Sequence, residues 1–140
     1  MTRDEAVRLA QALLAETGQP QSVGLNPQGF GGVAIENAQL YFEWHDPEQA
    51  LECSALIHKF RETPKPGILE GFQQEEKAGT DTGGGTVDYE SENKSLFLSR
   101  TFTQAPPNTI FVAEMKRLMR ASLVWHGEVL DRVASSVFKR

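Results

Sequence analysis

The chain has 140 residues, 39% hydrophobic and 24% charged residues, and a net charge of -5 at pH 7. One domain over residues 1–140 is the default at this length, because such a chain can bury about two-thirds of its unfolded surface. The acidic balance argues against nucleic acid as a partner, since phosphate binding needs a basic surface. No apolar run approaches the roughly 20 residues that span a bilayer, and the single cysteine, Cys53, cannot form an intrachain disulfide. We therefore expect a cytoplasmic protein without a membrane association.

The first half of the chain predicts one helix and three strands. Thr2 and Glu5 have the spacing of a capping box, and an apolar stripe over 6–14 follows, so a helix begins at once. Gly18 is a natural left-handed stop for it. Alternation of apolar and polar residues then predicts three strands joined by short connections, which is typical of an antiparallel meander. These strands cover Gly31–Glu36, Gln39–His45 and Leu51–Phe60.

The second half predicts a helix, a hairpin and a long helix. Asn108 can cap the long helix after Pro107, and an apolar stripe continues to Val137. The order α-β-β-β-α-β-β-α predicts an α+β fold in which about five antiparallel strands carry the first and last helices on one face. Phe42 and Trp125 should then be buried. The remaining predicted elements are a short helix over Gly67–Lys77 and strands over Thr86–Glu90 and Ser95–Thr103.

The residue types that carry chemistry do not form a recognisable motif. The glycines at 83–85 lack the Lys-Ser/Thr of a phosphate-binding loop, so we interpret them as a flexible loop. Glu43 and His45 share one strand face, but two residues are too few for a metal site, and a solvated strand face is the favoured interpretation. Cys53 lies on an apolar strand face, which indicates a buried thiol. We therefore predict no catalytic residue, no metal and no cofactor.

Apolar residues also occur where a solvated surface is expected. Tyr41, Leu56 and Phe97 fall on the polar faces of their strands, and the short helix adds an apolar set that has little partner surface within one small chain. Two interpretations stay open: loops or the short helix cover these side chains, or the side chains form a surface for a partner.

Two stretches resemble the type III secretion chaperones, the family that includes the Tir chaperone. In GGVAIENAQLYFEWHD, a strand, a turn and a second strand precede a short loop. In SLFLSRTFTQAPPNTIFVAEMKRLMRASLVWHGEVL, a strand is followed by a long helix with a central Trp125. The resemblance covers almost the whole chain and consists of topology and apolar spacing. It departs at Pro64–Gly85, where the family has a stronger leucine-rich helix that helps to form a dimer.

The resemblance implies a homodimer that binds the N-terminal, partly unfolded segment of a secreted effector and keeps it secretion-competent. The candidate client-binding residues are Leu9, Leu13, Tyr41, Leu56 and Phe97. The candidate dimer-interface residues are Ile68, Leu69, Phe72 and Tyr89. Two alternatives stay open: a regulatory or scaffold domain of the same fold without a secretion role, and a small ligand-binding domain or enzyme that uses the crevice between sheet and helices.

Overall fold

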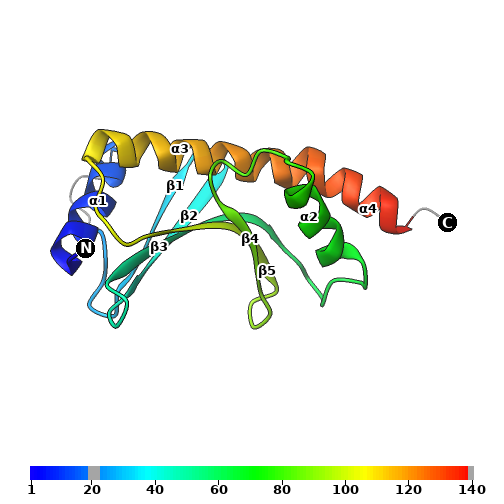
Figure 1. The fold of residues 1–140 in the computed structure, drawn as a ribbon, viewed down its shortest axis with the longest axis horizontal. Coiled ribbons are helices and arrows are strands. Elements are labelled where there is room, and N and C mark those ends of the chain that lie inside the picture. Colours follow the sequence, from blue (N-terminus) through cyan, green and yellow to red (C-terminus); the bar gives the residue numbers. More distant parts are fainter. Residues whose placement is uncertain (19–22, 139–140) are drawn as a thin grey trace.

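Five antiparallel strands form one sheet, and the helices cover one of its faces (Figure 1). The computed structural model describes residues 1–18 and 23–138. Strand order across the sheet is β1-β2-β3-β5-β4, and the predicted order of helices and strands along the chain is confirmed. In chain order the elements are α1 (Arg3–Ala15), β1 (Phe30–Ile35), β2 (Ala38–His45), β3 (Ala50–Lys59), α2 (Ile68–Lys77), β4 (Thr86–Glu90), β5 (Ser95–Phe102), α3 (Asn108–Val124), the π-helical turn η1 (Trp125–Val129) and α4 (Leu130–Phe138).

The core lies between the sheet and the helices, as the alternation of β2 and the stripe of the last helix predict. Phe42 and Trp125 are both buried, with exposed fractions of 1% and 0%. The predicted capping box is present in α1, where the Glu5 amide donates to Thr2 Oγ1 and the Thr2 amide donates to Glu5 Oε1. Figure 1 shows α3, η1 and α4 running in succession over the sheet, with α1 near one end and α2 near the other. Within residues 1–18 and 23–138, each helix falls short of the length or the apolar character needed to cross a bilayer.

Helix α3 begins one residue earlier than predicted, because Asn108 is its first residue and not its cap. Pro107 occupies the position before the helix and its carbonyl oxygen accepts a bond from the Phe111 amide, while Asn108 is already helical. The Asn108 side chain does not cap; its Oδ1 accepts a hydrogen bond from Arg8 Nε of α1 at 3.1 Å. The asparagine therefore joins the first and last helices instead of satisfying a free backbone amide.

A β-bulge in β3 changes which face of the sheet His58 occupies. The pairing of β3 with β5 shifts between Leu56, opposite Phe97, and His58, opposite Leu96. Cross-strand partners share a face, so His58 lies on the helix side, where its ring is 5.4 Å from that of His126. Strict alternation along β3 would put His58 on the same face as Leu56, but the extra residue of a bulge breaks the two-residue period.

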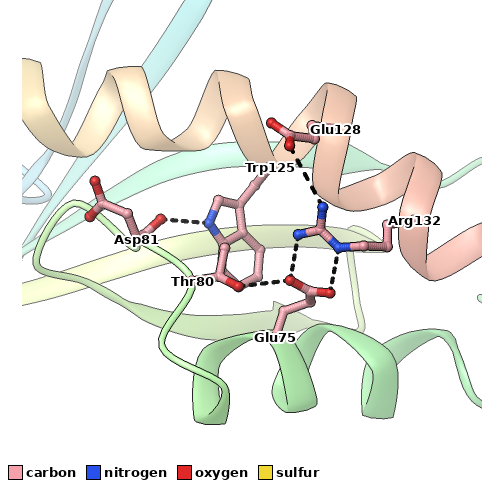
Figure 2. A network of polar contacts seen from close by, with 6 residues as sticks. All are labelled: Glu75, Thr80, Asp81, Trp125, Glu128 and Arg132. Carbon is pink, nitrogen blue, oxygen red and sulfur yellow. Dashed lines mark hydrogen bonds and ion pairs between the residues drawn. The ribbon is translucent and has the colours of Figure 1, made fainter.

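Helix α2 packs against α4 within the chain. Phe72 stacks on Trp125, with ring centroids 6.0 Å apart and an interplanar angle of 20°. A Cβ atom on Gly71 would lie 2.6 Å from Val133 Cγ1, so a glycine is required for this close approach. Beside the rings, Arg132 donates two hydrogen bonds to the Glu75 carboxylate, and Trp125 Nε1 donates to the Asp81 carbonyl oxygen at 2.8 Å (Figure 2). Together these contacts attach α2 and the loop after it to the last helix.

The glycines at 83–85 also have a packing role. Gly83 has φ +64°, and a Cβ there would lie 2.7 Å from the Arg117 carbonyl oxygen of α3. Gly85 is buried, and its Cβ would meet Leu118 Cδ1 at 2.8 Å. This loop thus lies directly against α3, and that contact explains Gly83 and Gly85.

Candidate functional site: the uncovered face of the sheet

The helices leave one face of the sheet uncovered (Figure 1). Residues from all five strands line a groove on that face. The register places these side chains in rows across the strands. Tyr41 pairs with Ser54, which pairs with Ser99; in the next row, Leu56 pairs with Phe97, which pairs with Asp88. We call this surface the open face and define it by its main groove-lining residues: Phe30, Tyr41, Glu43, Glu52, Ser54, Leu56, Asp88, Glu90 and Phe97.

A shallow groove of about 340 Å³ occupies the middle of the open face. Its floor is low because the central strands carry serines there, and Ser54 Oγ and Ser99 Oγ share a hydrogen bond of 2.8 Å. Aromatic rings form one wall, where Tyr41 and Phe97 meet edge to face with centroids 6.0 Å apart. Small polar side chains beside large apolar ones thus make a hollow with an apolar wall.

Three of the five predicted client-binding residues come together in this groove. Tyr41 is 44% exposed, and Leu56 and Phe97 are partly exposed cross-strand neighbours. Phe30 is a fourth apolar residue on this face, 49% exposed and opposite Glu43. Phe30 lies outside the predicted strand, which begins one residue later, at Gly31. Phe30 lies an odd number of residues before Val33 and Ile35, so strand alternation places it on the opposite face of β1. This spacing was the available signal.

The other two predicted client-binding residues are buried in the core. Leu9 and Leu13 are 0% exposed and belong to the face of α1 that packs into the core. A client cannot reach them in this fold, so their placement on a client-binding surface is corrected. The apolar stripe of α1 is therefore a core face, as its spacing alone indicates.

The four predicted dimer-interface residues divide in the same way. Phe72 is fully buried and Ile68 is 4% exposed, because α2 rests on Trp125 and α4. The premise that α2 has little partner surface within its own chain is therefore wrong for these two residues. Leu69 and Tyr89 are half-buried and keep part of their side chains at the surface.

Carboxylates gather around the groove with few cations beside them. Glu43, Glu52, Asp88 and Glu90 all line it, and Lys59 is the one Lys or Arg among its lining residues. Burial raises the pKa of Asp88, and the negative charges of Glu52 and Glu90 raise it further. The open face is therefore acidic as well as apolar.

His45 lies at one end of this acidic surface, between two of the carboxylates. Its Nε2 is 2.9 Å from Glu52 Oε1, and its Nδ1 is 3.8 Å from Glu43 Oε2. The hydrogen bond to Glu52 is the largest factor that raises the pKa of His45. The ligand atoms of the three side chains lie within 4.8 Å of one another, a spacing that a metal ion could bridge. The hydrogen bond to Glu52 already accounts for much of this grouping.

Comparison with known proteins gives a shared fold. No family model matches the chain, and no curated protein matches it. A chain in the crystal structure of the ExsC–ExsE complex superposes with a TM-score of 0.71 at 13% sequence identity, over 90% of this chain and 95% of that chain. At this identity the likeness concerns the architecture alone. The protein thus has the α+β fold, with one five-stranded antiparallel sheet, that the resemblance to secretion chaperones implies.

Proposed function

We propose that this protein is a non-enzymatic chaperone that holds the N-terminal, partly unfolded segment of a type III secreted effector in the cytoplasm and keeps it secretion-competent. The observation that carries the proposal is the gathering of Tyr41, Leu56 and Phe97 in one groove on the side of the sheet without helices. A contiguous exposed apolar surface of this kind commonly marks a partner-binding site. Such binding needs no catalytic group.

An extended polypeptide fits the geometry of this face. Along a strand, side chains on one face recur every second residue, which is about 6.6–6.8 Å. The row of Tyr41 and the row of Leu56 and Phe97 have this two-residue spacing, so alternate client side chains can contact successive rows. Strand β1 lies at the end of the sheet, and an added strand can donate backbone bonds to such an edge.

The solved neighbour supports a protein as the partner, since its fold occurs there in a complex of two named proteins, ExsC and ExsE. A regulatory or scaffold domain would use the same surface, and the identity of the captured partner distinguishes the two. The crevice between sheet and helices supports a ligand-binding or enzymatic role less well. Phe42, Phe111 and Trp125 fill it, each with at most 1% exposure.

The resemblance to secretion chaperones also supports a homodimer. With Ile68 and Phe72 buried, Leu69 and Tyr89 are the predicted interface residues that keep accessible surface. They lie on α2 and β4, two elements that contact each other. Light scattering at micromolar concentration should give the mass of two chains, and a monomer mass would contradict a stable dimer.

Paired substitutions test the client-binding role. Tyr41→Asp with Leu56→Asp places two charges in the apolar wall of the groove, and we expect the client to be lost from co-purification in the native cell. The matched control, Ile110→Asp with Val124→Asp, adds the same charges at positions on α3 that are 51% and 48% exposed. It should keep the client. Recovery of an effector N-terminal segment by both doubles would contradict a site on the open face, and recovery of a small metabolite alone would contradict the chaperone function.

A further inference from the structure

We infer that the groove on the open face selects client segments in which Lys or Arg alternates with apolar residues, and that it receives a basic side chain. The inference builds on the proposed function and specifies the chemistry of the client. It depends on the juxtaposition of an aromatic wall with a cluster of carboxylates that have few cationic partners.

The charges that line the groove favour a cationic side chain. Of the four carboxylates that line the groove, Glu43 and Glu52 contact His45. Within residues 1–18 and 23–138, neither Asp88 nor Glu90 has a Lys, Arg or His nitrogen within 4.0 Å. Elsewhere on the molecule, carboxylates such as Glu75 and Glu114 are paired with arginines. The groove is therefore a local excess of negative charge that a cationic side chain would neutralise.

The shape of the groove suits a long basic side chain. The small Ser54 side chain leaves the floor of the groove low beside the Tyr41 and Phe97 rings, and the four carboxylates line the same groove. A Lys or Arg side chain can lay its methylene stem along the apolar wall while its charged end reaches the acidic groups. The rings also favour a cation near their faces. Both halves of a basic side chain thus meet complementary surface.

Other occupants fit this combination poorly. A purely apolar segment would remove the Glu52 and Asp88 carboxylates from water without giving either of them a partner, which is unfavourable. An acidic segment would add like charge to a site where the pKa of Asp88 is already raised by burial and by neighbouring carboxylates. A segment that alternates apolar and basic residues avoids both costs.

Synthetic peptides of about ten residues, the length of a long strand, test the inference on the full chain. The probes alternate Leu with Lys, Leu with Gln or Leu with Glu. Binding is followed by two-dimensional amide NMR, which gives both the affinity and the location of the perturbed residues. We expect the Leu/Lys peptide to bind tightest and to shift the amides of Ser54, Leu56 and Phe97.

Charge-neutral variants give the matched comparison. Glu52→Gln with Asp88→Asn removes two carboxylates from the groove, whereas Glu62→Gln with Asp131→Asn makes the same change in net charge at exposed positions outside it. The groove double should bind the Leu/Lys peptide about tenfold more weakly, the effect of two partly exposed charge pairs, and the control double should lose less than about twofold. Glu90→Gln, at an exposed position, gives a second groove variant and should lose about two- to threefold.

The outcomes separate the two proposals. If the Leu/Gln peptide shifts the same amides with equal affinity, or if the two doubles lose affinity equally, selection for basic side chains is overturned and the open face remains a protein-binding site. If no peptide shifts the amides of the open face, or if the shifts lie elsewhere, selection and the proposed site fail together.

Discussion

Replacing Glu75 with Gln should lower the free energy of unfolding by about 1–2 kcal/mol at neutral pH. Glu75 on α2 accepts two hydrogen bonds from Arg132 on α4, from Nε at 2.8 Å and from Nη2 at 2.7 Å. Its Oε1 also accepts a bond from Thr80 Oγ1 at 2.8 Å (Figure 2). The amide of Gln keeps the shape of this side chain but loses the charge and one of its acceptor atoms.

The magnitude follows from the pKa of Glu75 and from the exposure of its partner. The hydrogen bonds from Arg132 lower the pKa of Glu75 from 4.5 to about 2. At 1.36 kcal/mol per pH unit, this difference sets an upper limit of about 3 kcal/mol. The Arg132 side chain is 48% exposed, however, so water screens the pair and reduces its contribution. Because the pKa is lower in the folded state, this stabilisation is fully present above pH ~4.5 and is lost as the pH falls towards ~2.

Urea unfolding of a double-mutant cycle measures this contribution. The cycle combines Glu75→Gln with Arg132→Gln, and the coupling energy should be about 1 kcal/mol at pH 7 and should shrink below pH ~4. Glu128→Gln is the control, because Glu128 is 72% exposed and lies 3.7 Å from the same arginine, so its loss should be below about 0.5 kcal/mol. A coupling energy near zero at pH 7, or one that does not change on acidification, would refute the reasoning.

Three further predictions concern the side chains of Trp125, His58 and Cys53. Trp125→Ala should lower the free energy of unfolding by roughly 3–5 kcal/mol because the ring is fully buried on Phe72, and a melting temperature equal to that of the parent would contradict this packing. Burial, with a smaller effect of His126, lowers the pKa of His58, so its contribution to stability is present above pH ~6.5 and is lost on acidification; His58→Gln should therefore flatten the decrease in melting temperature below that pH, and an unchanged decrease would argue against it. Burial raises the pKa of the Cys53 thiol, so a thiol reagent should label it only after unfolding, and rapid labelling of the native protein would show access.

The architecture could be predicted because local patterns and the tertiary structure agree. The alternation of Leu40, Phe42 and Trp44 follows the strand period, and all three are buried. Strict alternation does not hold at the bulge in β3, which puts His58 on the helix face, because a bulge adds a residue without a sequence signature of its own here. Periodicity therefore located the strands and missed the local break in register.

The candidate site could be predicted only in part. Tyr41, Leu56 and Phe97 stood out because they are apolar residues on strand faces expected to be polar, and the register brings them together. Their acidic neighbours come from three different strands, so only the pairing of those strands reveals the cluster. The apolar residues of α1 and α2 gave the same sequence signal whether they met this chain's own core or a partner, and the structure places Leu9 and Phe72 in the core.

Photo-crosslinking in the native cell tests the central claim most directly. A photoreactive phenylalanine analogue at Phe97 would report what contacts the groove, and the same analogue at Ile110 on the exposed side of α3 is the control. The proposed function predicts adducts from position 97 that contain the N-terminal segment of a secreted protein, with none of that segment at position 110. Adducts with that segment at position 110 and not at 97 would contradict the claim that the open face of the sheet holds the client.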